Sequence, residues 1–311
     1  MSDRKHPKKL SRRAFVKLAG GATLAGATVG LAGWSEVAHA SEDTSSADAD
    51  AKGVLVDIPK CIGCESCSMA CRAHNKLEWK PEDQAKTAEE RAQDPSKGLK
   101  SGTWTSINLY KSEVSGSVEN RFVKTQCLHC IEPACAGACF VNALRKTPEG
   151  PVVYNQGLCV GCRYCMLACP FDIIKYEWEK SIPGISKCQM CSDRLESGDS
   201  PACVSVCPTG AITFGKRSEL LAEAKRRISE NEGGVTYIKR VFGEEEAGGT
   251  SWMYISDVPF EDMRFRKDVP MSSIPSRTET YMTATPIVGV SWAAILTGIY
   301  VSRNKGKEPL D

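Results

Sequence analysis

Histidine is scarce in this sequence, whose 311 residues include only His6, His39, His74 and His129. None of them lies in the uncharged stretch of residues 280–302, so a helix there cannot by itself ligate a b-type haem. No Cys-x-x-Cys is followed directly by histidine, which excludes the attachment motif of a c-type haem. Haem-binding classes of electron carrier are therefore disfavoured.

A complete nucleotide-binding motif is also lacking. Residues 210–217 fit most of a phosphate-binding loop, but Arg217 stands where a Ser or Thr hydroxyl would bind magnesium. Because this stretch directly follows Cys207 and Pro208, we expect a β-strand there instead. No dinucleotide fingerprint and no pair of catalytic carboxylates stand out either. We therefore predict no catalytic residue in this chain.

Basic residues show no excess outside the N-terminal region. The chain holds 40 Lys and Arg against 38 Asp and Glu, and the first 40 residues contain seven of the former and two of the latter. The rest then has 33 basic and 36 acidic residues. Without a basic face, we expect no nucleic-acid partner.

Cysteine, by contrast, is abundant and regularly placed. All sixteen cysteines fall into four groups, at residues 61/64/67/71, 127/130/135/139, 159/162/165/169 and 188/191/203/207. An even number of cysteines could form disulfides. However, cysteines two residues apart would close strained small rings, whereas thiolates at that spacing can wrap one metal cluster. The spacing favours metal.

The first and third groups share the spacing C-x2-C-x2-C-x3-C, which is typical of bacterial ferredoxins. Gly63 and Gly161 stand between the first two cysteines of these groups, where the backbone must turn tightly and direct amide donors at inorganic sulfide. Short apolar strand signals follow three of the groups, at residues 143–144, 173–176 and 211–214. A repeated loop, helix and strand unit follows, which predicts an α+β fold.

The second and fourth groups vary this spacing, as C-x2-C-x4-C-x3-C and C-x2-C-x11-C-x3-C. Zinc ribbons also use paired Cys-x-x-Cys, so zinc is the alternative metal. The prolines that follow Cys169 and Cys207 match the ferredoxin run and favour iron–sulfur clusters. We expect His129, inside the second group, to be a surface residue or a donor to cluster sulfur, and not an iron ligand.

Ligation is expected to cross between groups, because in two-cluster ferredoxins the fourth cysteine of each run ligates the other cluster. Proximity in the chain pairs the second group with the third, and hence the first with the fourth. The sequence then predicts two interleaved ferredoxin-like modules, one inserted in the other, with four [4Fe-4S] clusters. The predicted ligands are Cys61, Cys64, Cys67 and Cys207 at site 1; Cys188, Cys191, Cys203 and Cys71 at site 2; Cys127, Cys130, Cys135 and Cys169 at site 3; and Cys159, Cys162, Cys165 and Cys139 at site 4.

The N-terminus has the pattern of an export signal. Arg12 and Arg13 lie in the segment SRRAFVK, before a Gly- and Ala-rich apolar run and a small-x-small cleavage site that ends at Ala40. The paired arginines indicate the twin-arginine route, and a Sec signal is the alternative. A protein that receives its clusters in the reducing cytoplasm must fold before export, which favours a route for folded cargo. We predict a twin-arginine signal peptide at residues 1–40 and a periplasmic location.

Residues 280–302 are 23 residues without a charge. As a helix they would extend roughly 35 Å, enough to cross a bilayer core. A buried amphipathic helix is the alternative, because several Thr and Ser dilute the run. Aromatic residues within the span and the basic Arg303, Lys305 and Lys307 after it favour a membrane anchor with a cytoplasmic tail at 303–311.

The remaining segments follow from these landmarks. We expect a linker at 41–56, the four-cluster domain at 57–215 (57–77 with 185–215, and 120–180, paired) and a docking extension at 216–279. The extension should contain a helix over 219–228, capped by Ser218 and packed on its own domain, and strands over 236–242 and 250–255. Residues 78–104 form a polar insertion that we expect to be a surface loop.

With these features, the chain resembles the iron–sulfur subunits of complex iron–sulfur molybdoenzymes and membrane-bound hydrogenases. The resemblance is carried by the four cysteine groups, the eleven-residue gap after Cys191 and the stretch 162–166. It is greatest to the exported iron–sulfur subunit of the type 2 uptake hydrogenase, and next to the beta subunit of respiratory formate dehydrogenase. Nitrate-reductase-type relatives replace one cysteine of the third group by Trp, whereas all four are present here.

The resemblance implies a non-catalytic relay between an exported catalytic subunit and an integral membrane quinone-reactive subunit. A hydrogenase-like catalytic subunit is preferred. A formate dehydrogenase beta subunit, or a relay fed by a multihaem cytochrome c, is the alternative. A reductase with an open iron site is disfavoured, because sixteen cysteines on four cubanes leave no iron open. A purely structural scaffold would not require four clusters.

Overall fold

The structure, a computed structural model, describes residues 51–78, 98–114 and 116–304. The predicted signal peptide, most of the linker, residues 79–97 of the polar insertion and the tail beyond residue 304 lie outside these ranges. Short strands and short helices alternate along the chain, as expected of an α+β fold. The strands are β1 Lys52–Asp57, β2 Thr105–Val114, β3 Ser117–Gln126, β4 Leu144–Lys146, β5 Val152–Tyr154, β6 Lys175–Tyr176, β7 Ile185–Ser186, β8 Ile212–Lys216 and β9 Trp252–Ile255.

The helices are short except for the last two. They are α3 Ser66–His74, α7 Ala134–Gly137, α8 Tyr164–Ala168, α9 Ser192–Glu196, α10 Ala202–Ser205, α11 Arg217–Glu230 and α12 Ile274–Asn304. Single 3-10 turns are η2 Ile58–Lys60, η3 Gln156–Leu158, η4 Glu232–Gly234, η5 Glu246–Gly248 and η6 Phe260–Met263.

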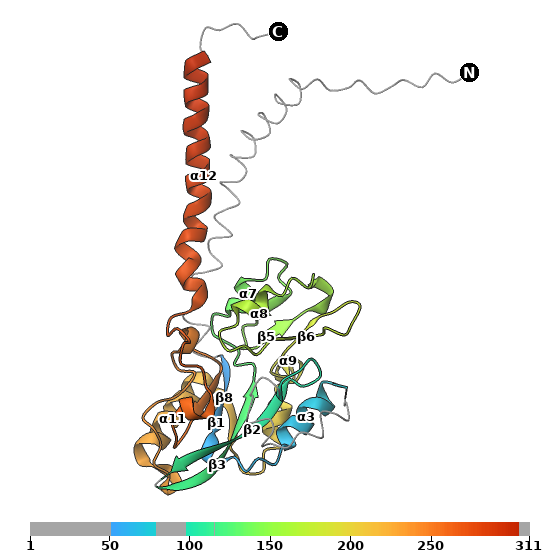
Figure 1. The fold of residues 1–311 in the computed structure, drawn as a ribbon, viewed down its shortest axis with the longest axis vertical. Helices are drawn as coiled ribbons and strands as arrows, with labels where there is room; N and C mark the ends of the chain where they lie inside the picture. The colour runs from blue at the N-terminus through green and yellow to red at the C-terminus, as the bar shows by residue number, and fades with distance from the viewer. Residues whose placement is uncertain (1–50, 79–97, 115, 305–311) are drawn as a thin grey trace, which may run out of the picture. The chain divides into compact units, whose positions relative to one another are not determined.

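A three-stranded sheet in the order β8-β1-β9 joins segments that are far apart in the sequence (Figure 1). β1 pairs antiparallel with β8, where Val54 lies opposite Phe214. It pairs parallel with β9, where Val56 lies opposite Tyr254. Residues 52–56, expected to belong to a linker, therefore form a buried strand. The chain just before the first cysteine group is hydrogen-bonded to the chain just after the fourth.

The two faces of this sheet bury different side chains, since successive side chains of a strand point to opposite faces. One face packs against α11, with Leu55 and Ala224 among the buried residues. The other face carries Val56 and Trp252 into the main core, which also contains Cys67. The helix thus covers the side of the sheet away from the cysteines.

A two-stranded hairpin, β2 and β3, leads directly into the second cysteine group. Its strands are antiparallel, with Thr105 opposite Gln126 at the base. Ile107 and Val123 join the main core, whereas the first residues of β3 are exposed. The hairpin therefore connects a solvent-exposed tip to the cysteine sites at its base.

A smaller unit is built from the pairs β4–β5 and β6–β7 with the short helices α7 and α8 (Figure 1). Its apolar cluster combines Leu144, Ile174 and Ile185 with Cys135 and Cys165. Each strand here has two or three residues, so buried cysteines supply much of the core that longer elements would supply elsewhere.

The extension after β8 packs on its own domain, as the sequence predicts, but two details differ. α11 begins at Arg217, and its N-cap is Lys216, so Ser218 is not the cap. Residues 236–242 do not form a strand, and only Phe242 makes an isolated bridge, to Tyr254. The alternation of apolar residues there reflects burial of an irregular segment and not sheet pairing.

Arg217 explains why residues 210–217 are not a phosphate-binding loop. Most of this stretch is strand β8, as expected. The guanidinium donates to the carbonyl oxygens of Thr250, at 2.8 Å, and of Gly243 and Glu244, at 3.2 and 3.1 Å. The residue that departs from the motif therefore holds the turn between residues 243 and 250.

α12 is a single helix of 31 residues that contains the predicted apolar span and begins six residues before it. From residue 277 to residue 303, nearly all of its side chains are exposed, including Trp292 and Tyr300. Burial of α12 against the described residues is therefore excluded. By length and composition, α12 is the one helix among the described residues that could cross a membrane.

Candidate metal centres

A small cavity is lined by cysteines of two distant groups, Cys61, Cys64, Cys67 and Cys207. The loop between the first two turns at Gly63, where φ is +71°. A Cβ atom there would lie 2.4 Å from the Phe122 ring, so this loop requires glycine. The structure thus brings together the four residues predicted for site 1.

Two further cavities combine the second and third groups in the same way. One is lined by Cys127, Cys130, Cys135 and Cys169, and the other by Cys139, Cys159, Cys162 and Cys165. Backbone amides point at sulfur: Gly161 donates to Cys159 Sγ at 3.4 Å, and Ala143 donates to Cys139 Sγ at 3.2 Å. Amide donors of this kind stabilise the sulfur atoms of iron–sulfur clusters.

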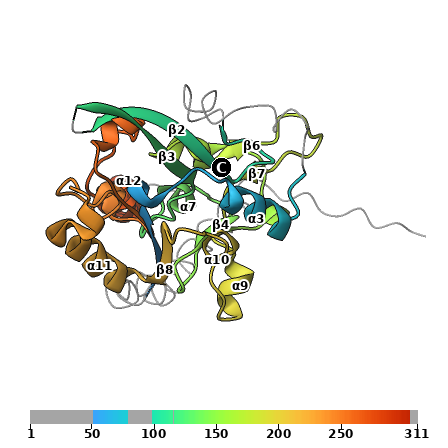
Figure 2. The ribbon, with the colours of Figure 1, turned by 90° about the horizontal axis from the view of Figure 1, so that it is seen from below.

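The remaining four cysteines, Cys71, Cys188, Cys191 and Cys203, are all buried. Cys71 lies on α3 and Cys203 on α10, and these helices lie side by side (Figure 2). Burial raises the pKa of Cys71 to about 12, and the thiols of Cys203 and Cys191 add to that shift. Burial also raises the pKa of Cys188, with Cys71 as the next cause. The packing of α3 against α10 thus brings Cys71 and Cys203 to adjacent helices, and the four thiols stay a prediction for site 2.

The cysteine sets suit a cluster better than one metal ion. Within the described ranges, no three His, Cys, Asp or Glu side chains are grouped as they would be around a single ion. A zinc site would draw its sulfur atoms to about 2.3 Å from one centre. Four thiols around a small cavity, with amides aimed at sulfur, fit the larger [4Fe-4S] cluster. Such a cluster supplies one-electron transfer when bound, while this chain supplies its thiolates, amides and apolar walls.

Burial opposes ionisation of these thiols. It raises the pKa of Cys67 and Cys165 to about 11 and that of Cys135 to about 12. Iron binds thiolate, so each ligand must lose a proton when a cluster binds. Cluster binding then replaces a neutral buried thiol by a coordinated thiolate and releases the proton.

Buried cations, which the sequence analysis did not single out, lie among the cysteines. Lys124 and Lys187 are each 2 % exposed. Lys187 donates to the carbonyl oxygen of Cys188 at 2.9 Å, and the partly buried Lys146 donates to that of Cys130 at 2.9 Å. Their nearness to cysteine groups in the sequence is a signal that could have found them, because lysine is rarely buried without a partner.

Of the two roles expected for His129, that of a surface residue is wrong, because the side chain is fully buried. Its Nδ1 accepts a hydrogen bond from the backbone N–H of Val152 at 2.8 Å. Burial lowers its pKa well below the ordinary value, and the charges of Lys187, Lys146 and Lys124 lower it further. The imidazole is therefore neutral, and its Nε2 has no hydrogen-bond partner among the described residues.

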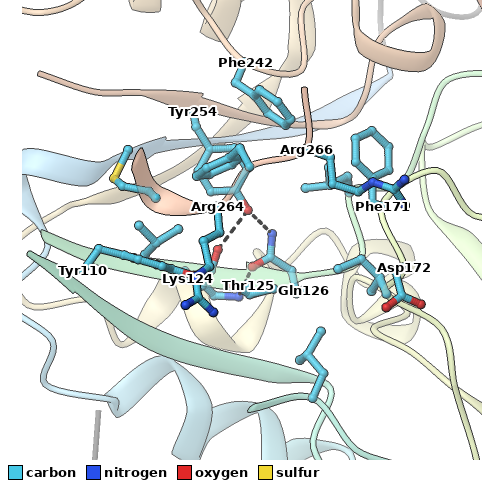
Figure 3. A pocket seen from close by; sticks show the side chains of 16 residues that line it. Tyr110, Lys124, Thr125, Gln126, Phe171, Asp172, Phe242, Tyr254, Arg264 and Arg266 are labelled. Atoms are coloured by element: carbon cyan, nitrogen blue, oxygen red, sulfur yellow. Dashed lines mark hydrogen bonds between the residues drawn. The ribbon is translucent and has the colours of Figure 1, made fainter. Parts of the chain in front are cut away.

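A larger cavity of about 360 Å³, whose lining side chains are drawn in Figure 3, adjoins the cavities of sites 1 and 3. Lys124 lines both this cavity and that of site 1, and Phe171 lines both this cavity and that of site 3. The Tyr254 hydroxyl lies between the Lys124 carbonyl and the Gln126 amide and is hydrogen-bonded to both (Figure 3). Hydrogen-bonded side chains therefore line the cavity that adjoins the two sites.

Comparison with known proteins agrees with this site. The family described as "4Fe-4S dicluster domain" matches residues 118–217, which contain the last three cysteine groups. A protein of Nitratidesulfovibrio vulgaris is 42% identical over 300 residues, which are 96% of this chain and 78% of that protein.

Two relatives with informative names are more distant. The hydrogenase-2 operon protein HybA of Escherichia coli O157:H7 is 34% identical over 284 residues, 83% of this chain and 84% of HybA. The iron–sulfur subunit of the nitrate-inducible formate dehydrogenase of Escherichia coli (strain K12) is 34% identical over 202 residues, 65% of this chain and 66% of that subunit. The chain therefore belongs to the family of [4Fe-4S] electron-transfer subunits that includes HybA and the iron–sulfur subunits of formate dehydrogenases.

Proposed function

We propose that this chain carries electrons through four [4Fe-4S] clusters, one at each of sites 1 to 4. The observation that supports this best is the composition of the three cysteine-lined cavities. Each takes three cysteines from one group and the fourth from the paired group. This is the crossed ligation of two-cluster ferredoxins, in which the two clusters of a module share their cysteine runs. The chain then contains two ferredoxin-like modules, with the second and third groups inserted between the first and the fourth.

The chain acts as a relay and not as the site of catalysis. Sixteen cysteines on four cubanes give every iron a protein ligand, which leaves no iron open to a substrate. The Arg217 contacts rule out a phosphate-binding loop at residues 210–217 as well. Electrons therefore enter and leave through the clusters to other proteins.

The partners follow from the relatives. HybA is named for the hydrogenase-2 operon, and the more distant relative is an iron–sulfur subunit of formate dehydrogenase. We infer a catalytic subunit on the exported side, hydrogenase-like for preference, and an integral membrane subunit that reacts with quinone. A formate dehydrogenase, or a multihaem cytochrome c as electron donor, is the alternative.

The location follows from the two ends of the chain. α12 exposes its apolar side chains and is long enough to cross a bilayer, so we assign it as a C-terminal anchor. Arg12 and Arg13 assign export to the twin-arginine route. The cluster domain then lies on the periplasmic side of the membrane, and the tail after α12 lies in the cytoplasm.

The test of the four-cluster assignment is the metal content of the full chain, purified without oxygen. We expect about sixteen iron and sixteen sulfide per chain, as four cubanes require. The control is the variant Cys64→Ala, which should bind about four iron fewer because one cubane loses a ligand. Stoichiometric zinc, or about twelve iron in the unaltered chain, would contradict the assignment.

A further inference from the structure

Lys124 is a buried cation held by neutral partners. Its side chain is 2 % exposed, and its Nζ donates to Thr105 Oγ1 at 2.6 Å and to Gln126 Oε1 at 3.0 Å. It also lies 4.5 Å from the centroid of the Trp252 ring. No carboxylate pairs with it among the residues that the structure describes. A buried ammonium without an anion is costly, so its charge calls for another counter-charge.

The thiols around Lys124 come from two different sites. Lys124 lines the site 1 cavity together with Cys61, Cys64, Cys67 and Cys207. Thr105 joins Lys124 to α3, because its hydroxyl accepts from the ammonium and its carbonyl accepts from Ser68 Oγ at 3.1 Å. Ser68 lies on α3 between Cys67 of site 1 and Cys71 of site 2. Clusters bound at sites 1 and 2 would therefore be the anions that Lys124 faces.

We propose that Lys124 is the shared counter-charge of the clusters at sites 1 and 2 and raises the reduction potentials of both. This inference rests on the proposed assignment of clusters to these sites. A cubane with four thiolates is an anion, and reduction adds one more negative charge. A fixed cation nearby stabilises the reduced state more than the oxidised one, and the dry surroundings strengthen the effect. One lysine thereby makes two neighbouring clusters easier to reduce.

The network around Lys124 holds the charge in place. The Tyr254 hydroxyl donates to the Lys124 carbonyl at 3.0 Å and accepts from Gln126 Nε2 at 2.7 Å (Figure 3). Gln126 also accepts from the ammonium of Lys124, so backbone and side chain are fixed by the same tyrosine and glutamine. The ammonium of Lys124 is therefore held in a defined orientation, and Lys124 acts as a counter-charge and not as a ligand.

The experiment compares Lys124→Met with Lys146→Met in the full chain. Methionine keeps the unbranched shape and removes the charge. Lys146 is the matched control, because its ammonium donates to the carbonyl oxygen of Cys130, a proposed ligand of site 3, at 2.9 Å. The iron content is measured first, and the four midpoint potentials are then obtained by redox titration followed by EPR spectroscopy. In Lys124→Met we expect two of the four midpoint potentials to become more negative. In Lys146→Met we expect the midpoint potential of a different cluster to become more negative.

Each outcome decides a separate point. Unaltered protein without four clusters would overturn the cluster assignment itself. If the unaltered chain has four clusters and Lys124→Met keeps them with unchanged midpoints, the counter-charge role is wrong. Lys124→Met with only about eight iron, restored to about sixteen by Lys124→Arg, would support the role, since two cubanes would need the cation. Failure of Lys124→Arg to restore them would show that shape and not charge matters there.

Discussion

At the scale of single residues, the buried carboxylate of Asp57 is neutralised by several partners. Asp57 is fully buried at the end of β1, where it accepts hydrogen bonds from Arg227 and Tyr237, each at 3.1 Å. Lys60 lies 3.3 Å from the same carboxylate. This network ties the start of the cluster domain to α11 and to the segment after it.

Removal of one partner from this network should destabilise the domain. In Arg227→Met, the buried carboxylate of Asp57 loses its guanidinium, and we expect a loss of about 3 kcal/mol in the free energy of unfolding. The control is Arg226→Met, because Arg226 pairs with Glu223 and Glu232 at the surface and should matter little. Thermal unfolding of cluster-loaded protein without oxygen compares the two. Equal midpoints would show that the Asp57 pair is not important for stability.

Crossed ligation can be tested by pairs of cysteine substitutions. Cys207→Ala and Cys67→Ala remove ligands from the same proposed site, so the double variant should lose about four iron, no more than either single variant. Cys207→Ala combined with Cys203→Ala should lose about eight, because these two belong to different sites. Iron analysis of the purified variants is the measurement. The opposite result, with four iron lost from the second pair and eight from the first, would assign each group to its own cluster.

At the scale of secondary-structure elements, α12 is joined to the cluster domain at its first turn. The Ser273 hydroxyl donates to Glu132 and accepts from the backbone N–H of Ser276 at 3.1 Å. Glu132 lies in the second cysteine group, between Cys130 and Cys135. The helix that is proposed to enter the membrane therefore begins beside site 3.

Removal of this helix should separate anchoring from electron transfer. Truncation after Arg277 keeps Ser273 and Ser276 and removes the apolar span, which holds no histidine or acidic side chain to bind haem or move protons. We expect a soluble protein with all four clusters that still accepts electrons from its catalytic partner. Quinone reduction by the complex should fall sharply. The measurements are iron content, dye-coupled activity and quinone-coupled activity of the truncated complex.

The matched control for this truncation is the full chain with Trp292→Leu, which keeps an apolar helix of the same length. It should retain both activities. Quinone-coupled turnover by the soluble truncated form without any membrane partner would mean that this chain itself carries the quinone site.

At the scale of the whole molecule, the order of assembly is constrained by the pairing of β1 with β8 and β9. As assigned, sites 1 and 2 each take cysteines from the first and the fourth group, so site 1 would be complete only when the chain is made through residue 207, and site 2 only when it is made through residue 203. Closure of the sheet brings those groups together, since β1 precedes the first and β8 follows the fourth. A domain of this kind must fold and receive its clusters in one compartment.

Export should therefore depend on a route that carries folded protein. Replacement of Arg12 and Arg13 by lysine should leave precursor with its clusters in the cytoplasm. The control is Lys8 and Lys9 replaced by arginine, which keeps the charge and leaves the paired arginines intact. Fractionation with iron analysis of each fraction is the measurement. Normal periplasmic accumulation of the lysine variant would indicate the Sec route instead.

The cysteine groups, the ferredoxin spacing and the apolar C-terminal helix could be predicted from the sequence, because these depend on local spacing and composition. The sequence also indicated a strand at residues 211–214 after Cys207, where β8 spans Ile212–Lys216. Gly63 and Gly161 were identifiable for the same reason, since a tight turn between two ligands requires a backbone that only glycine adopts easily.

How distant segments meet is visible only in the folded chain. Contacts between residues far apart in the sequence pair β1 with β8 and β9, bury His129 and place Lys124 beside the cysteine sites. A lysine or histidine in a polar stretch is typical of a surface, and the nearness of these residues to cysteine groups is the one local signal of their burial. The side chains of Lys124 and His129 can be buried because residues around the cysteine sites supply hydrogen-bond partners for them. These partners are distant in the sequence or are brought near only by the fold.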